Sequence, residues 1–426
     1  MLLQFSVKNF KSFKEEAVLT MEASSDASLP ENLTETDSTR FLNTAVIFGA
    51  NGAGKSSLLS AIRAAVILIR HSNTRQVSDP LLEIVSFRFD PETVTEASSF
   101  EFVFLARGMK YVHGFSATRK EIQDEYLYAY HSSKASTIFE RSNVREYRFT
   151  SSALKRELLP LVRFNSDNKL FLATAAAWNS EAVKVPYLWF EQSIHVCPTD
   201  FEQLFLQNAP LFDQDEDQSL HKFALQLLYE ADLDIDDFEI EVKETDSSHM
   251  LQQSAAALYT SVPVKSDRRN RKVRIETIHS YEHNGQPVTC RLSLQEESAG
   301  TQYLFLLIPI LKRAFETGET LFVDASDSNL HPLLLHYLIS LFNSPDLNKA
   351  HAQLVLSTHG VSLLSMDSLR RDQIWFVEKD RKTGTSDLYS LDDFSSFKDE
   401  KSSLKDEDIR KACMIGRFGS IPDLPE

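Results

Sequence analysis

The chain has 426 residues, of which 42% are apolar and 25% charged, the composition of an ordinary soluble globular protein with one large core and an insertion, or with two domains. Its net charge of −16 argues against constitutive coating of DNA, which needs clustered cations, and its apolar runs fall short of the ~20 residues that span a bilayer. The interrupted N-terminal hydrophobic stretch predicts no signal peptide, and three widely spaced cysteines (Cys197, Cys290 and Cys413) predict buried thiols in a cytoplasmic protein.

The first elements form a strand-rich opening. Apolar and polar residues alternate over 2–20 and predict an antiparallel hairpin, and a stretch rich in Ser, Asp, Glu and Thr over 22–40 predicts a surface loop. Thr44–Phe48 has the apolar character of a buried strand, and the helix that opens at Ser57 continues to about His71.

A phosphate-binding loop of the form G-x-x-x-x-G-K-S lies between that strand and that helix. Backbone N–H groups of such a loop surround a triphosphate, the lysine reaches the β- and γ-phosphates, and the serine hydroxyl binds Mg²⁺. The predicted nucleotide-binding residues are Gly49, Ala50, Asn51, Gly52, Ala53, Gly54, Lys55, Ser56 and the following Ser57. The motif predicts binding of ATP or GTP together with Mg²⁺.

The middle of the chain changes from strands to helices. Alternating segments over 84–130, including Ser86–Phe89, predict an antiparallel sheet with a turn at 106–109. Residues 150–232 are predicted to be mainly helical, followed by strands at Phe238–Val242 and Val273–His279. A basic cluster within 265–272 is best interpreted as a solvated loop, with a phosphate or partner contact as the alternative.

From about residue 292 strands and helices alternate, which predicts a parallel sheet. The sequence therefore predicts an α/β protein with a split nucleotide-binding core: a first lobe at 1–130, an inserted, mainly helical arm or partner-binding region at 131–290, and a second lobe at 291–426.

Three further features belong to the second lobe. The apolar strand Thr320–Asp324 ends in a carboxylate, a Walker B pattern in which Asp324 supports Mg²⁺. Ser298 and Gly300 precede a long apolar helix and offer a hydroxyl and N–H groups to a phosphate, although simple helix capping by Ser298 or Thr301 would be the preferred interpretation if this motif stood alone. His359 follows the next strand, at the sheet edge where ligands bind in such folds.

The order of these motifs resembles the ABC-type ATPases of the RecF/SMC-like branch, and in particular bacterial anti-phage defence ATPases such as RloA, AbiL and PtuA. The resemblance rests on the phosphate loop, the ESAGTQ segment at 297–302, LFVDASDSNLHP at 321–332 and STHG at 357–360, with an opening segment at 5–13 and a closing segment at 416–422. The middle of the chain, 130–290, is matched only loosely. The resemblance implies an ABC-type head with an antiparallel β subdomain and an inserted arm.

The resemblance also implies roles for single residues. Lys55 and Ser56 would hold phosphate and Mg²⁺, and Ser298 and Gly300 would press the γ-phosphate of a second subunit, so a homodimer would be the minimum assembly. His359 would sense the γ-phosphate.

At position 325 the family pattern has a glutamate that orients the attacking water, and this chain has alanine. A methyl group takes no proton, so ATP binding should survive while hydrolysis is disabled. Ala325 is either an engineered replacement that traps ATP or the native residue of a nucleotide switch, and the intact remainder of the site favours the first. Asp327 is a poor substitute because it lies beyond the strand.

The short segment after His359 leaves no room for a nuclease domain, so the expected function is an ATP-gated subunit of an anti-phage system that controls a separate nuclease or toxin effector. The alternative is a RecF-like DNA repair or recombination clamp, which the acidic net charge disfavours, so DNA binding is open but not indicated. A transporter domain fits poorly because nothing recognisable couples to a membrane subunit.

Overall fold

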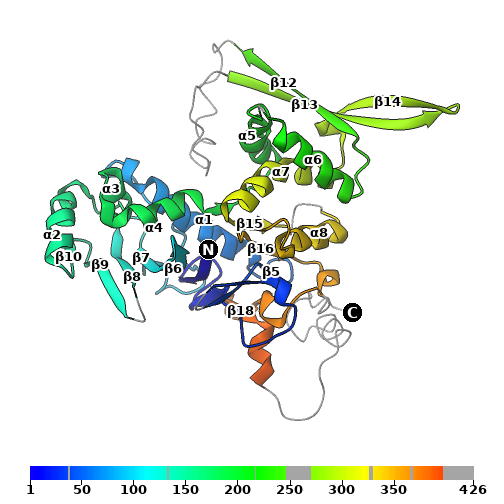
Figure 1. Ribbon diagram of the computed structural model, residues 1–426. Coiled ribbons are helices and arrows are strands. Elements are labelled where there is room, and N and C mark those ends of the chain that lie inside the picture. The colour runs from blue at the N-terminus through cyan, green and yellow to red at the C-terminus, as the bar shows by residue number, and fades with distance from the viewer. Residues whose placement is uncertain are drawn as a thin grey trace.

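The computed structural model describes residues 1–36, 39–131, 134–215, 217–245, 270–325, 330–364 and 368–396 (Figure 1). A six-stranded sheet in the order β11-β15-β16-β5-β17-β18 forms its centre, and its neighbouring strands run parallel except for the antiparallel pair β17–β18. The predicted α/β class is confirmed. The strands are β5 (Thr44–Phe48), β11 (Ile194–Val196), β15 (Thr320–Asp324), β16 (Gln353–Thr358), β17 (Ile374–Lys379) and β18 (Ser386–Ser390).

The central strands are apolar because both faces of this sheet are covered. Ala45 and Ile47 of β5 belong to one hydrophobic core, whereas Val46 and Phe48 belong to the other, as the alternation of side chains along a strand requires. Helix α1 (Lys55–His71) packs in the first core, and α7 (Ala299–Thr317) and α8 (Pro332–Asn343) pack in the second.

A seven-stranded sheet in the order β10-β9-β8-β7-β6-β1-β2 adjoins the first core, with every pair antiparallel. Its strands are β1 (Leu2–Lys8), β2 (Ala17–Thr20), β6 (Ser98–Ala106), β7 (Met109–Ala117), β8 (Ile122–Tyr130), β9 (Ala135–Ser142) and β10 (Glu146–Arg148). The predicted turn at 106–109 is confirmed: Arg107 and Gly108 have φ of 50° and 77°, the left-handed pair that suits a tight hairpin.

The segment 131–290 contributes to several parts of the molecule. Its strands β9 and β10 extend the antiparallel sheet, β11 forms the edge of the central sheet, and only its later portion, with strands β12 to β14, projects from the body (Figure 1). The three-part division of the chain stays a prediction. The segment contains α2 (Ser152–Leu158), α3 (Phe171–Ala177), α4 (Glu181–Gln192), α5 (Phe201–Phe212), α6 (Ser219–Glu230), β12 (Asp237–Thr245) and β13 (Asn270–His283), and β14 (Gln286–Ser293) completes the projecting sheet.

Several local predictions were wrong. Ser86–Phe89 is not a strand, because Asn9 Oδ1 accepts the Phe87 N–H at 3.1 Å and holds this segment against the β1–β2 turn. The expected loop at 22–40 contains part of a small strand pair, β3 (Leu33–Glu35) with β4 (Arg40–Leu42), and Cys290 is exposed rather than buried.

Some predictions fall outside the described residues: Asp327, Cys413, the closing segment at 416–422 and all side chains of the basic cluster within 265–272. Within the part of the chain that the structure describes, no helix combines the length and apolar character needed to cross a membrane.

Candidate nucleotide-binding site

The phosphate loop connects the end of β5 to the start of α1, at the carboxyl edge of the central sheet. Gly54 has a φ of 124°, and a β-carbon there would lie 2.5 Å from Ser386 Oγ. A β-carbon at Gly49 would lie 2.5 Å from the carbonyl oxygen of Val377. Both positions therefore require glycine, one for its backbone conformation and both for the close approach of β17 and β18.

Lys55 is buried inside this loop. Its Nζ donates hydrogen bonds to the carbonyl oxygens of Gly49 at 2.7 Å and Ala50 at 3.1 Å. An ammonium that is only 4% exposed needs such acceptors, because desolvation without partners is costly. The cation is thus held within the loop whose N–H groups and helix N-terminus attract an anion.

Ser56 and Asp324 come together although they are 268 positions apart in the sequence. Ser56 Oγ donates to Asp324 Oδ2 at 2.7 Å, and Ser357 Oγ donates to Asp324 Oδ1 at 2.6 Å. The pairing of β15 with β16 explains the second contact, because Asp324 and Ser357 are direct neighbours in the sheet. A hydroxyl and a carboxylate are hard oxygen ligands of the kind Mg²⁺ uses beside substrate phosphates, so this pair fits the predicted metal.

Two serines that the sequence analysis did not select support the loop from the side. Ser386 Oγ donates to the carbonyl oxygen of Ala53 at 2.6 Å, and its N–H donates to the carbonyl oxygen of Ser12 at 2.7 Å. The Ser12 hydroxyl is buried and has no hydrogen-bond partner among the described residues. Neither contact could be read from local sequence, because only the fold brings these distant segments together.

Ala325 and His359 lie at the same sheet edge. The Ala325 N–H donates to the carbonyl oxygen of Ser357 at 2.9 Å, so the strand ladder continues one residue past Asp324. His359 is exposed and follows Thr358, which pairs with the last residue of β5, immediately before the phosphate loop. The register therefore puts position 325, His359 and the phosphate loop on neighbouring strand ends, while their roles stay predictions.

Ser298 and Gly300 begin helix α7. Ser298 Oγ accepts the Thr301 N–H at 3.1 Å, the capping contact of the simpler interpretation. Since α7 ends just before β15 begins, the helix runs antiparallel to that strand and its N-terminus points toward the carboxyl edge. Burial, with smaller contributions from Cys197 and Asp324, raises the pKa of the Tyr303 hydroxyl well above its usual value.

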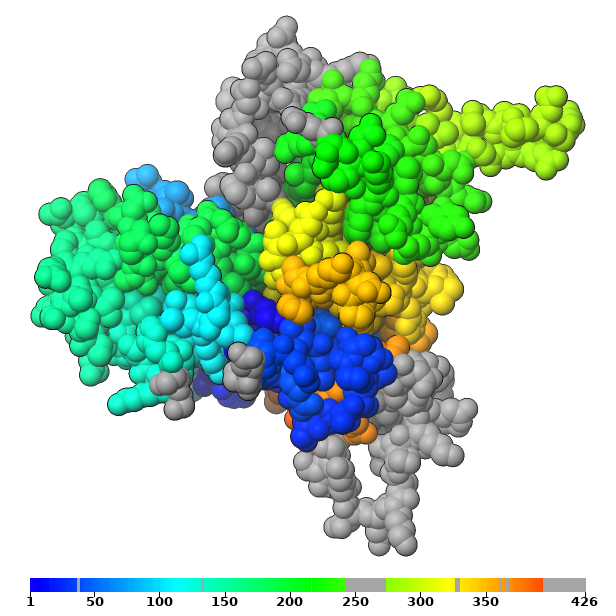
Figure 2. Space-filling view, viewed as in Figure 1, coloured from blue at the N-terminus to red at the C-terminus, as the bar shows by residue number. Residues whose placement is uncertain are grey.

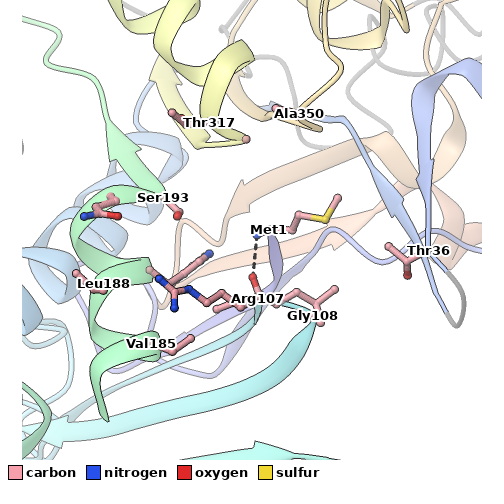
Figure 3. Close-up of a pocket in the computed structure, with 14 residues that line it drawn as sticks. Met1, Thr36, Arg107, Gly108, Val185, Leu188, Ser193, Thr317 and Ala350 are labelled. Carbon is pink, nitrogen blue, oxygen red and sulfur yellow. Dashed lines mark hydrogen bonds between the residues drawn. The ribbon is translucent and has the colours of Figure 1, made fainter. Parts of the chain in front are cut away.

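A cavity of about 380 Å³ lies away from this site (Figure 3). It is lined by Arg107 in the β6–β7 turn, by Val185 and Leu188 of α4, and by Thr317 and Ala350, which precede β15 and β16. It thus opens at the amino edge of the central sheet, opposite the phosphate loop, and contains none of the predicted site residues.

Comparison with known proteins shows the family to which the chain belongs. Residues 45–365, most of the chain, match the model of the family described as "AAA domain, putative AbiEii toxin, Type IV TA system". The match includes Lys55, Ser298, Asp324 and His359. No curated protein matches the chain.

Three solved structures are distantly similar. An SMC head bound to the C-winged helix domain of ScpA has 11% identity and a TM-score of 0.45, covering 91% of this chain and 97% of that one. The SMC head domain from Thermotoga maritima has 13% identity and a TM-score of 0.38, covering 91% and 98%. An Smc head domain with an extended coiled coil, bound to the C-terminal domain of ScpA derived from Pyrococcus furiosus, has 10% identity and a TM-score of 0.38, covering 93% and 98%.

Proposed function

We propose, since this chain belongs to the family described as "AAA domain, putative AbiEii toxin, Type IV TA system", that it is the ATP-binding subunit of a bacterial anti-phage defence system. Two copies close around two ATP molecules, a signal of infection changes this dimer, and a separate nuclease or toxin effector is released or activated. The family is one of P-loop ATPases, and the defence role, the dimer and the effector are our proposals.

One observation carries the nucleotide-binding part of this proposal. The hydroxyl of Ser56, at the end of the phosphate loop, meets the carboxylate of Asp324, at the end of β15, at 2.7 Å. Chance similarity to a phosphate-loop motif would not bring a buried carboxylate from a remote segment to that serine. The two residues would hold Mg²⁺, which on binding neutralises phosphate charge.

The other residues act around that pair. Lys55 binds the β- and γ-phosphates, and the loop N–H groups orient them. In the proposed dimer, Ser298 and Gly300 of each subunit contact the γ-phosphate held by the other, and His359 senses the same phosphate. Each pocket is then incomplete in a single chain, which makes ATP the condition for assembly.

In this proposal, Ala325 determines how long the ATP-bound dimer lasts. Its methyl group accepts no proton and aligns no water, so the chain binds ATP and hydrolyses it poorly. A closed dimer would then persist until something other than hydrolysis opens it. For an engineered Ala325, this property traps the ATP-bound dimer; for a native Ala325, it suits a sensor in which infection, rather than turnover, triggers the change.

The test is ATP-dependent assembly. We expect sedimentation or light scattering to show a monomer without nucleotide and a dimer with ATP and Mg²⁺, and Lys55→Ala to abolish the change. A chain that stays monomeric with saturating ATP, or retains no nucleotide, refutes the proposal. Isolation of the native complex from its host tests the second half: a nuclease or toxin partner supports defence, whereas recombination proteins would favour a repair clamp.

A further inference from the structure

A hydrogen-bonded contact joins the projecting β-sheet to the start of helix α7. The Glu297 carboxylate accepts hydrogen bonds from the Thr277 hydroxyl at 2.5 Å and from His279 Nε2 at 2.7 Å. The side chains of His279 and Glu297 are only 21% and 11% exposed, so water reaches this carboxylate poorly and the two donors matter. Because a carboxylate only accepts, the His279 nitrogen that faces it carries a proton.

His279 stands at the point where β13 leaves the body of the protein. Thr277 and His279 share one face of the strand, and Thr277 is fully buried, whereas residues 280–287 are all exposed. Beyond His279 the β13–β14 hairpin continues as a two-stranded ribbon, whose tip stands clear of the visible surface in Figure 2. Such a ribbon is positioned by its base, and the contact with Glu297 is part of that base.

Glu297 is equally tied to the predicted signature residues. It immediately precedes Ser298, and the Gln302 side chain of α7 donates to the Glu297 carbonyl oxygen at 2.6 Å and to that of Gln295 at 3.2 Å. Ser298 in turn caps the helix through Thr301. The segment before α7 and the first turn of α7 are therefore one hydrogen-bonded unit, and a shift of Glu297 moves Ser298 with it.

We infer that His279 is a positioning residue, which through Glu297 makes the placement of Ser298 depend on the placement of β13. This inference rests on the proposed function, in which Ser298 contacts the nucleotide of a second subunit. A partner that binds the hairpin then alters ATP-driven dimerisation without touching the phosphate loop. By reciprocity, closure of the dimer shifts the hairpin by the same free energy of coupling.

The projecting region offers a matched control for testing this residue. His221 Nε2 contacts Asp237 Oδ1 at 2.8 Å, a second histidine–carboxylate pair that joins α6 to β12. We compare His279→Ala with His221→Ala, and use His279→Gln as a rescue because its amide retains an N–H donor. Sedimentation gives the dimer dissociation constant with ATP and Mg²⁺, and a fluorescent ATP analogue gives the affinity of the dilute monomer.

We expect His279→Ala to weaken the dimer about a hundredfold, because a lost hydrogen bond to a charged group is on the scale of tenfold and the loss occurs in each of two symmetric sites. The ATP affinity of the monomer should not change, His221→Ala should resemble the parent, and His279→Gln should recover most of the loss. Equal dimerisation by His279→Ala and the parent overturns the inference, as does an equal loss in His221→Ala or a loss of monomer ATP affinity. A parent chain that never dimerises refutes the proposed function instead.

Discussion

We expect that replacing Ala325 by glutamate raises the rate of ATP hydrolysis. The backbone at this position is fixed, since the Ala325 N–H donates to the Ser357 carbonyl oxygen at 2.9 Å and Asp324 is held by two serine hydroxyls. A glutamate side chain would start from that fixed point, one residue past the carboxylate that we propose supports Mg²⁺. Ala325 is 5% exposed and lies at the sheet edge that carries the phosphate loop, so an added carboxylate would be placed near that loop.

The expected gain follows from the chemistry of the added group. A positioned general base contributes about 10²- to 10⁴-fold to a rate, or about 2.7–5.5 kcal/mol of activation free energy at 25 °C. Steady-state phosphate release by the parent, Ala325→Glu and Ala325→Gln measures it. The glutamine variant has almost the same size and takes no proton, so it separates base catalysis from a packing effect.

Two results would refute the reasoning. If Ala325→Glu releases phosphate no faster than Ala325→Gln while both bind ATP like the parent, position 325 does not serve as the base. If the parent already turns over at the rate of Ala325→Glu, hydrolysis uses another group and the trapped dimer loses its basis.

Three further predictions concern the metal, the loop and a buried histidine. Ser56→Ala should reduce the Mg²⁺-dependent gain in ATP affinity by at least about tenfold, whereas the control Ser60→Ala, one turn along α1, should leave that gain unchanged. Titration calorimetry with ATP, with and without Mg²⁺, measures the gain for each variant. Gly54→Ala should lower the free energy of unfolding by about 3 kcal/mol, because its backbone has a positive φ and the new β-carbon would lie 2.5 Å from Ser386 Oγ. Gly52→Ala also has a positive φ but meets nothing within 4 Å, so it should lose only the free energy due to backbone strain. Equal urea midpoints for the two variants would contradict this prediction. Burial, and next the charge of Arg313, lowers the pKa of His195 well below its usual value. Below about pH 6.5 the histidine therefore binds a proton in the unfolded chain but not in the folded chain, so the free energy of unfolding falls as the pH drops. His195→Asn should flatten this fall by up to about 1.4 kcal/mol per pH unit between pH 7.5 and 5.5 in urea unfolding, and an unchanged slope would rule the histidine out.

The motifs of the site could be predicted because each is short and local. The phosphate loop is a continuous run of eight residues, and Asp324 ends a strand whose apolar character is visible without a partner. Ser357 and Ser386 could not be found in this way. Their hydroxyls act on Asp324 and on Ala53 through strand pairing and packing, which no local pattern encodes.

The same physics explains the errors in the fold. Ser86–Phe89 has the alternation of a strand, but Phe87 is buried while Phe89 is 70% exposed, because Asn9 rather than a neighbouring strand takes the backbone hydrogen bond. Strand β14 was missed because most of its side chains are exposed and show no apolar face. Sequence periodicity reports burial against a core, so it fails where a strand pairs without being buried.

A buried side chain at the opposite edge of the sheet joins the segments that lead to Ser56 and Asp324. Gln353 begins β16 and is 1% exposed. Its side-chain oxygen, Oε1, accepts hydrogen bonds from the Leu2 N–H at 2.7 Å and the Thr320 hydroxyl at 3.0 Å. Its amide donates to the carbonyl oxygens of Leu2 at 3.0 Å and Leu42 at 3.2 Å. All four hydrogen-bonding positions of this amide are used, and they connect β16 to β1, to the end of β4 just before β5, and to the start of β15. Since the phosphate loop follows β5 and Asp324 ends β15, this buried side chain supports the strand pairing that brings the two halves of the proposed nucleotide site together.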